Sequence, residues 1–304
     1  MNQKNCMVAQ SGGPTVAINA SLAGVIDGVS ASSMYDTVYG SLNGITGILN
    51  DDLLNLTELM DGHPEYLTRL AQTPAMYLGS CRYKLPNYLD DDSPYVFIFK
   101  QFETYHIEAF FYIGGNDSMD TCNKISKYMQ KVGYECRVMG VPKTIDNDLF
   151  GTDHCPGYAS AAKYIATSLM EVYQDAHVYD TGMICIVEIM GRHAGWLTAA
   201  AALATKYGAG PDLIYLPETD FDMDTFLADV ERIYKETGSC MVAVSEGIHY
   251  ADGSFVSEAK TSATDGFGHA QLGGLAALLA GIVKEKTGAK VRGIELSLLQ
   301  RCGA

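Results

Sequence analysis

The chain has 304 residues, enough for one large α/β domain or two smaller ones, each with a well-filled core. Hydrophobic residues make up 47% of it and charged residues 19%, which argues against a disordered chain. Its 21 Lys+Arg stand against 36 Asp+Glu, and a net charge of −15 repels phosphate backbones and anionic membranes. We therefore expect neither a nucleic-acid nor a membrane partner, and an anionic substrate would need local positive groups.

The cellular compartment follows from cysteine spacing and from the apolar runs. The sequence contains no stretch of 18 consecutive apolar residues, so we expect no transmembrane helix. Its N-terminus has no apolar core of signal-peptide length. The 8 cysteines are scattered singly without a CxxC pair, which favours reduced thiols over a disulfide framework or a zinc site. We expect a cytoplasmic protein.

Strand and helix patterns alternate along the chain. The first half shows strand patterns and helical spacing in turn, with strands at 5–10, 36–41, 109–115 and 136–142 and helices at about 15–29 and 117–130. The second half continues with strands at 182–191, 213–218, 240–247 and 290–297, and with one long helix over 192–208 that ends at Gly208. We expect 182–191 to be a central strand, and the acidic run 90–92 to be a solvated loop. This alternation predicts an α/β fold with mostly parallel strands and helices on both faces.

Two lobes suit this length and order of elements. We expect residues 1–150 to form one lobe and 151–304 most of a second, with a cleft between them. In open α/β sheets, ligands bind beyond the carboxyl ends of the strands. Nearly all the polar residues of interest follow a predicted strand, so the sequence predicts a binding site there.

Three small-residue turns in the first half suit a phosphate group. Gly12, Gly13 and Pro14 lie between the first strand and a helix, and Gly114-Gly115-Asn116-Asp117-Ser118 repeats that arrangement. In Leu78-Gly79-Ser80-Cys81-Arg82 the arginine could clamp a phosphate with two hydrogen bonds. Taken singly, each has a simpler explanation: a plain turn, a carboxylate in the first turn of a helix for Asp117, and a surface arginine for Arg82.

The segment Pro142-Lys143-Thr144-Ile145-Asp146-Asn147-Asp148 has the composition that phosphoryl transfer needs. One carboxylate can accept the proton of an attacking hydroxyl, a second can face Mg²⁺, and the lysine can neutralise phosphoryl oxygens. A polar turn built on an Asp or Asn side chain is the alternative, and it would not need the lysine.

Further polar residues follow strands of the second half. They lie in Met190-Gly191-Arg192, Ser245-Glu246-Gly247 and Gly268-His269-Ala270-Gln271. Arg192, Glu246 or His269 could each be structural on its own. Their common position at strand ends favours a shared site.

These motifs resemble the phosphofructokinase family. SGGPTVAIN, LGSCRYK, GGNDSMDT, PKTIDND, MGRHAG, SEG and GHAQLGG follow one another in the family's order, over residues 6 to about 300. The variants are most similar to its diphosphate-dependent branch and the longer mixed-donor group. The resemblance implies the two-lobed phosphofructokinase fold of doubly wound, mostly parallel sheets, with the active site in the cleft between the lobes.

The resemblance also implies roles for individual residues. Asp146 would be the base that deprotonates the 1-hydroxyl of fructose 6-phosphate, with Lys143 and Asp117 also catalytic. Gly12, Arg82, Asp117 and Lys143 would bind the phosphoryl donor in the 1–150 lobe. The sugar phosphate would bind mainly in the 151–304 lobe, through a set that comprises Thr144, Ile145, Asp146, Met190, Gly191, Arg192, Glu246 and His269. Asn116 falls where ATP-using relatives place a magnesium-binding aspartate, so Asp148 would take more of the metal role.

Donor choice and the chain end complete the comparison. ATP-using relatives carry glycine at the positions of Asp117 and Lys143, so a carboxylate here would repel nucleotide phosphate. Met183, Ala263 and Leu272 stand where those relatives place sugar-phosphate arginines. The chain stops within an element that the family continues, so we expect the second lobe to lack its C-terminal end and to bind fructose 6-phosphate less well than diphosphate.

The expected function is therefore a glycolytic phosphotransferase. It would use Mg²⁺ and move a phosphoryl group from diphosphate to fructose 6-phosphate, as a homo-oligomer, dimer or tetramer. Two alternatives remain: an ATP-dependent enzyme of the same fold, and a non-catalytic ligand-binding or regulatory subunit.

Overall fold

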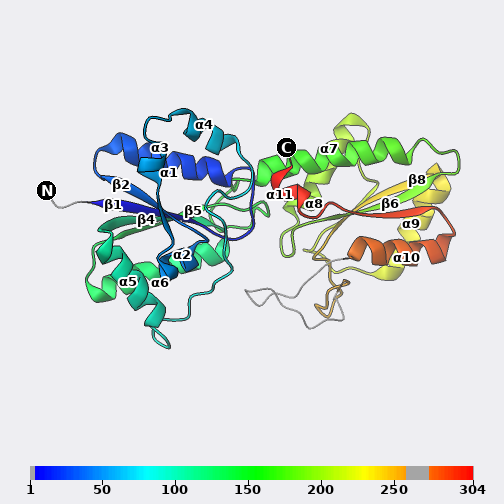
Figure 1. Ribbon diagram of the computed structural model, residues 1–304. Coiled ribbons are helices and arrows are strands. Elements are labelled where there is room, and N and C mark those ends of the chain that lie inside the picture. Colours follow the sequence, from blue (N-terminus) through cyan, green and yellow to red (C-terminus); the bar gives the residue numbers. More distant parts are fainter. Residues whose placement is uncertain (1–3, 258–273, 304) are drawn as a thin grey trace. The chain divides into compact units, whose positions relative to one another are not determined.

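The computed structural model describes residues 4–257 and 274–303. The chain divides into two compact units, Met1–Thr144 and Ile145–Ala304. Each unit is a parallel or nearly parallel sheet covered by helices on both faces (Figure 1). The α/β class expected from the alternating pattern is confirmed.

The first unit contains a five-stranded sheet in the order β3-β2-β1-β4-β5. Its strands are β1 (Asn5–Gln10), β2 (Thr37–Ser41), β3 (Leu53–Asn55), β4 (Ile107–Gly114) and β5 (Arg137–Pro142). Only β3, a short edge strand, is antiparallel to its neighbour. β1 pairs with β2 and β4 in parallel, and all six of its residues are buried because helices cover both faces.

Two apolar layers enclose this sheet. Cys6 and Val8 point into one layer and Met7 and Ala9 into the other, as the twofold repeat of a strand requires. The first layer holds α1 (Ile18–Ser32), α3 (Leu56–Met60) and α4 (Glu65–Gln72). The second holds α2 (Ile45–Asn50), α5 (Ser93–Thr104) and α6 (Asn116–Val132). Figure 1 shows these two groups on opposite sides of the strands.

The second unit contains a fully parallel four-stranded sheet in the order β7-β8-β6-β9. Its strands are β6 (Met183–Ile189), β7 (Leu213–Tyr215), β8 (Ser239–Ser245) and β9 (Val291–Glu295). One face packs against α7 (Tyr158–Ala176), α8 (Trp196–Ala200) and the 3₁₀ helix η1 (Ala201–Tyr207). The other packs against α9 (Met223–Thr237) and α10 (Leu275–Thr287), and α11 (Leu299–Cys302) contacts α7. β6 is an inner strand, as predicted for 182–191.

Two helices start later in the structure than the sequence predicted. The helix expected from about residue 15 begins at Ile18, because the Thr15 hydroxyl accepts hydrogen bonds from the Ala17 and Ile18 amides and so caps the helix from outside. The single long helix expected over 192–208 is wrong. Gly191 has a φ of 117° and turns the chain first, so α8 starts only at Trp196 and tightens into η1 before Gly208.

The acidic run 90–92 is exposed, as expected for a solvated loop. Asp91 accepts hydrogen bonds from the amide and the hydroxyl of Ser93, at 3.0 and 2.6 Å, where α5 begins. These bonds stabilise the ionised carboxyl and lower the pKa of Asp91.

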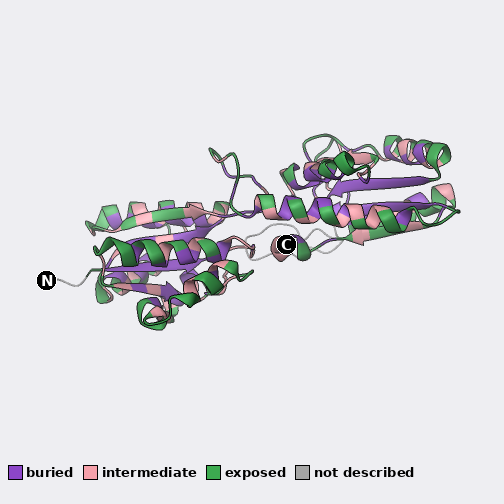
Figure 2. Cartoon of the chain, turned by 90° about the horizontal axis from the view of Figure 1, so that it is seen from above, coloured by how far each residue is buried: buried purple, intermediate pink, exposed green. Residues whose placement is uncertain are grey.

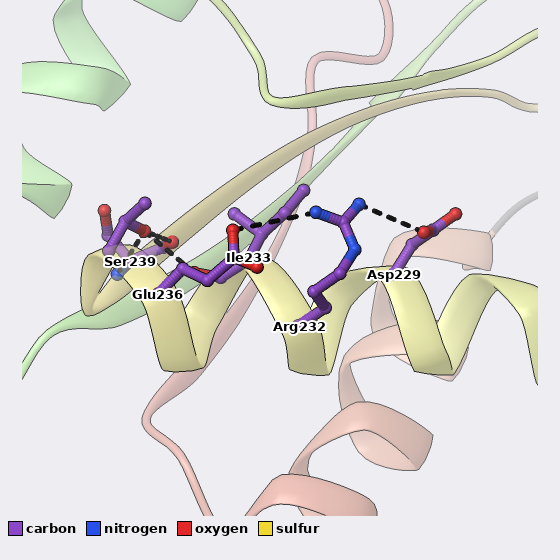
Figure 3. A network of polar contacts seen from close by, with 6 residues as sticks. Asp229, Arg232, Ile233, Glu236 and Ser239 are labelled. Atoms are coloured by element: carbon purple, nitrogen blue, oxygen red, sulfur yellow. Dashed lines mark hydrogen bonds and ion pairs between the residues drawn. The ribbon is translucent and has the colours of Figure 1, made fainter.

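Helix faces follow the expected division between core and solvent. Figure 2 shows purple on the inner strands and on the sheet-facing sides of the helices, and green on the outer sides of the helices. On the outer side of α9, Arg232 contacts Asp229 at 3.2 Å and Glu236 at 3.7 Å (Figure 3). These pairs are solvent-exposed, so they contribute little to stability. Within the described ranges, no helix has both the length and the apolarity to cross a bilayer.

One carboxylate lies inside the core of the second unit. Glu188, in the central strand β6, is 3% exposed, and its Oε2 accepts a hydrogen bond from the Ala276 amide at 2.9 Å. Ala276 and Leu275 lie in the first turn of α10, where amides lack partners within the helix. Burial is the main cause of a raised Glu188 pKa, and these amide bonds oppose it. Glu188 therefore ties α10 to the central strand.

We predict that Glu188→Ala lowers the free energy of unfolding, by roughly 1–3 kcal/mol for each amide left without an acceptor. Glu188→Gln keeps an oxygen acceptor and removes a buried charge, so at pH 8 it should be at least as stable as the parent. Because the folded-state pKa is raised, the cost of ionising Glu188 appears as pH rises, and any gain from glutamine should shrink toward pH 4. Thermal unfolding of both variants checks this, and equal stabilities of the two would contradict the capping role.

Candidate functional site

The carboxyl edge of the first sheet brings together three of the predicted turns. Lys143 follows β5, and its amide donates to the Gly114 carbonyl at the end of β4, at 2.9 Å. Its Nζ donates to the Gly13 carbonyl in the turn after β1. The same Nζ lies 3.3 Å from where a Cβ on Gly12 would be, and Gly12 has a φ of 82°. Lys143 is only 3% exposed, so a buried ammonium lies on the Gly12–Gly13 turn.

The Gly79–Arg82 loop is held against the same turn. The Ser80 hydroxyl donates to the Gly12 carbonyl at 2.7 Å, and Asn43 Nδ2 donates to the Ser80 carbonyl at 3.1 Å. The Ser11 hydroxyl contacts the Cys81 carbonyl at 3.4 Å. These bonds place the exposed Arg82 beside the glycine turn, where the sequence predicted a donor contact.

The helix α6 begins at this edge with Gly115 as its N-cap. Asn116 is exposed, and Asp117 is a half-buried carboxylate in the first helical turn. The positive end of the helix dipole stabilises a carboxylate there. Asp117 therefore has a structural role that does not exclude the predicted functional one.

In the second unit, the ends of β6 and β8 are linked by hydrogen bonds. The Gly191 amide donates to Glu246 Oε1 at 3.3 Å, and the Ser245 hydroxyl donates to the Gly191 carbonyl at 2.8 Å. A Cβ on Gly247 would lie 1.8 Å from the Arg192 carbonyl oxygen, so glycine is required for this approach. The Met190 amide donates to Gln300 Oε1 at 3.0 Å. The structure thus brings Met190, Gly191, Arg192 and Glu246 together.

Glu246 is a carboxyl at this edge whose pKa is raised. Burial raises its pKa from an ordinary 4.5 to about 6; the negative charge of Asp146 adds to the rise, and Arg192 opposes it. The half-buried Arg192 has an Nε that finds no hydrogen-bond partner in the part of the chain that is described. This edge therefore combines a carboxyl with a raised pKa and a guanidinium whose Nε has no hydrogen-bond partner among the described residues.

The Pro142–Asp148 segment crosses from one unit to the other. Lys143 and Thr144 belong to the first unit, whereas Ile145 lies in the core of the second. Asn147, with a φ of 58°, donates to the Asp153 carbonyl at 3.0 Å and accepts from the Cys155 amide at 2.8 Å. The alternative of a polar turn thus holds for Asn147. The loop it builds leaves the Asp146 side chain half-buried and Asp148 exposed.

Some predicted positions are not part of these groups. His269, Ala263 and Leu272 lie outside the described residues. Met183 is the first residue of β6, at the opposite end from Met190, and is buried in the apolar core.

Several residues that shape the two edges were not predicted. They are Gln10, Asn19, Asn43, Ser80 and Gln300. A glutamine that ends the apolar CMVA run was the available signal, because a buried amide needs partners.

The fold and these two edges define an α/β protein whose candidate ligand groups lie at the carboxyl ends of parallel strands. The chain belongs to the phosphofructokinase family: the family model described as phosphofructokinase matches residues 5–304. The expected family and its fold are thereby confirmed.

Three relatives show how close the similarity is. The chain is 44% identical over 305 residues to the pyrophosphate–fructose 6-phosphate 1-phosphotransferase of Halomonas elongata, covering 99% of this chain and 72% of that protein. It is 46% identical over 307 residues to the protein of the same name from Xanthomonas campestris pv. campestris, covering 99% and 71%. A crystal structure of pyrophosphate-dependent phosphofructokinase from Nitrosospira multiformis matches with a TM-score of 0.83 at 37% identity, covering 98% of this chain and 70% of that one.

We predict that Glu246→Gln stabilises the protein at neutral and alkaline pH. A rise in pKa from 4.5 to about 6 makes ionisation of Glu246 cost about 2 kcal/mol in the folded state. The cost is complete above pH 6 and disappears as pH falls below 4.5, so the gain from glutamine should be present at pH 8 and absent at pH 4. Denaturant unfolding at the two pH values measures it, and the same gain at both would exclude this cause.

Proposed function

We propose that this chain is a phosphotransferase that moves a phosphoryl group from diphosphate to the 1-hydroxyl of fructose 6-phosphate, giving fructose 1,6-bisphosphate in glycolysis. The observation that carries the proposal is the buried Lys143 ammonium on the Gly12–Gly13 turn. In a net-negative protein it supplies positive charge where a dianionic donor would bind. The names of the relatives from Halomonas elongata and Xanthomonas campestris support this substrate pair.

Diphosphate is favoured over ATP by two side chains at this edge of the sheet, one of them beside the glycine turn. The Lys143 Nζ lies against Gly12, and Asp117 places a carboxylate in the first turn of α6. Nucleotide phosphate near Asp117 would meet a like charge, whereas diphosphate has no further groups to place there. Arg82, held beside the turn through Ser80, would bind the donor with a charge-assisted bond.

In the proposed reaction, Asp146 accepts the proton of the 1-hydroxyl as its oxygen forms a bond to phosphorus. The bond between that phosphorus and the bridging oxygen breaks, and inorganic phosphate leaves. Lys143 and Arg82 offset the charge on the phosphoryl oxygens. Thr144 and Ile145 contact the sugar beside Asp146, while Met190, Gly191, Arg192, Glu246 and His269 hold the sugar phosphate.

The proposal includes Mg²⁺ as the cofactor. Among residues 4–257 and 274–303, no three His, Cys, Asp or Glu side chains form a metal site by themselves. A magnesium–diphosphate complex needs only one or two protein oxygens, and the exposed Asn116 and Asp148 side chains can offer them, so the donor set fits. When bound, the ion would neutralise charge on the donor oxygens.

Location and assembly complete the proposal. We place the protein in the cytoplasm as a homo-oligomer, dimer or tetramer, without a nucleic-acid or membrane partner. The acidic composition supports the last point. All eight cysteines are free, which agrees with a reducing compartment.

The deciding experiment is a turnover assay with fructose 6-phosphate and Mg²⁺, supplied with either diphosphate or ATP. We expect fructose 1,6-bisphosphate from diphosphate and little from ATP. Turnover only with ATP would favour the ATP-dependent alternative. The absence of turnover with both donors, in a protein that binds fructose 6-phosphate, would favour the non-catalytic alternative.

We predict that Asp146→Asn lowers kcat by about 10²-fold or more, the usual effect of losing a general base. The amide is isosteric, so KM for fructose 6-phosphate should change much less. Asp153→Asn is a suitable control, since it changes a carboxylate on the same loop. Near-normal kcat in the Asp146 variant would remove this residue from the mechanism.

We also predict that Asp117→Gly combined with Lys143→Gly weakens diphosphate use and admits some ATP. The double change removes both the like charge and the bulk beside the Gly12 turn. The ratio of kcat/KM for the two donors measures the shift. Efficient ATP use by the unmodified protein would refute the exclusion argument.

A further inference from the structure

Two buried primary amides lie behind the candidate donor edge. Gln10, the last residue of β1, is 0% exposed, and Asn19, in the first turns of α1, is 1% exposed. Gln10 Nε2 donates to Asn19 Oδ1 at 3.0 Å and contacts the Ile18 carbonyl at 3.3 Å. The pair links the strand before the Gly12 turn to the helix after it.

Both side chains also bind the backbone of one segment outside β1 and α1, and Asn19 Oδ1 accepts a second hydrogen bond in doing so. Gln10 Oε1 accepts from the Leu78 amide at 2.9 Å, and Asn19 Oδ1 accepts from the Tyr77 amide at 2.9 Å. Asn19 Nδ2 donates to the Thr73 carbonyl at 3.0 Å. Thr73–Leu78 is therefore bound at both ends to β1 and α1, directly before the loop that carries Arg82.

Such an arrangement costs free energy unless every amide group is satisfied, because burying an unpaired amide is unfavourable. Neighbouring core positions in the same layer are apolar, among them Val8 and Leu22. The amide side chains at positions 10 and 19 are explained by their hydrogen bonds to the backbone of Thr73–Leu78. The backbone of Thr73–Leu78 has no strand of the sheet to pair with, so side chains supply its partners.

We propose that Gln10 and Asn19 are positioning residues of the donor site. They hold Thr73–Leu78 against β1 and α1, and this placement sets the Gly79–Arg82 loop on the Gly12 turn. Asn43 also fixes the end of this segment, since its backbone amide donates to the Leu78 carbonyl at 2.7 Å. The consequence for ligand binding rests on the proposed function, whereas the consequence for the loop does not.

The physical reason is pre-organisation. A loop that is already ordered loses little conformational entropy when a ligand binds, and a displacement of about 1 Å in a binding group can cost up to 10²-fold in rate. Loss of either amide should free the loop and weaken the contact that Arg82 makes. The candidate sugar-phosphate residues Arg192 and Glu246 belong to the second unit and have no bond to this pair, so their function should not change.

The experiment compares Gln10→Met and Asn19→Leu, each close in volume to the parent, with Asn5→Leu as the control. Asn5 is 1% exposed at the other end of β1, and its Nδ2 donates to the Tyr105 carbonyl at 2.7 Å. Asn5→Leu therefore removes a buried amide, as the two test variants do, but leaves the hydrogen bonds of Thr73–Leu78 in place. Asn19→Asp is a partial-loss variant, because it keeps the acceptor oxygen for the Tyr77 amide but loses the donor to the Thr73 carbonyl and adds a buried carboxyl.

The first measurement needs no substrate. Trypsin cleavage after Arg82 and Lys84, and hydrogen exchange at the Tyr77 and Leu78 amides, should each become about tenfold faster in the Gln10 and Asn19 variants. The Asn5 variant should stay near the parent, and Asn19→Asp should lie between them. Unchanged cleavage and exchange in a folded Asn19→Leu protein would overturn the proposal. If that variant does not fold, Gln10→Met and Asn19→Asp decide in the same way.

The second measurement is the affinity for diphosphate, by calorimetric titration and by KM. The Gln10 and Asn19 variants should bind diphosphate about tenfold more weakly, with KM for fructose 6-phosphate within about twofold of the parent. In an Arg82→Ala background the Asn19 change should have little further effect, since it acts through that loop. Full additivity of the two changes would refute the positioning role. If the parent binds no diphosphate, the proposed function fails, and the cleavage and exchange rates still decide the loop placement.

Discussion

Burial of both faces of parallel sheets is the constraint on which the rest of the structure depends. β1 and β6 are each buried along their whole length, so most of their side chains are apolar and the polar ones need hydrogen-bond partners. Polar groups can then collect only where strands end, and in a parallel sheet all carboxyl ends share one edge. The residues at that edge in the first unit include Gly12, Asp117 and Lys143; Gly191 and Glu246 occupy the corresponding edge in the second. Position in the fold, more than local sequence, therefore gathers these separate loops into two groups of polar residues.

The same constraint explains the exceptions inside the core. Glu188, Gln10 and Asn19 are polar and almost fully buried, and each binds backbone amides that have no partner in a helix or a strand. Glu188 holds the start of α10, and the two amides hold Thr73–Leu78. Glu188 and Gln10 each connect an element that lies beside the sheet to a strand that ends at a candidate site, whereas Asn19 connects Thr73–Leu78 to α1. These side chains relate the core to the positions of functional groups more directly than apolar packing does.

The two edges differ in the sign of the charge that they present. In a chain of net charge −15, the first edge concentrates a buried ammonium, an arginine and the N-terminus of α6. The second edge is more acidic: burial and the negative charge of Asp146 raise the pKa of Glu246, and Arg192 offsets part of this rise. A phosphoryl donor suits the first, and a hydroxyl acceptor that gives up a proton suits the second. The proposed reaction needs both characters, and the stability that ionised Glu246 costs the folded protein is consistent with a functional reason for retaining it.

The amino-acid sequence by itself determined the class of fold, the inner position of β6 and the family, because strand and helix periodicities and ordered motifs are local properties. It also offered a set of candidate site residues, of which Gly12 and Lys143 lie together at one edge, and Gly191 and Glu246 at another. Only the tertiary structure decided the late start of α8, the capping by Glu188 and the hold of Gln10 and Asn19 on Thr73–Leu78. Those features join residues that lie up to 88 positions apart in the chain, as Glu188 and Ala276 do. Which buried polar group meets which backbone amide depends on how layers pack, and a pattern read along one segment does not contain that information.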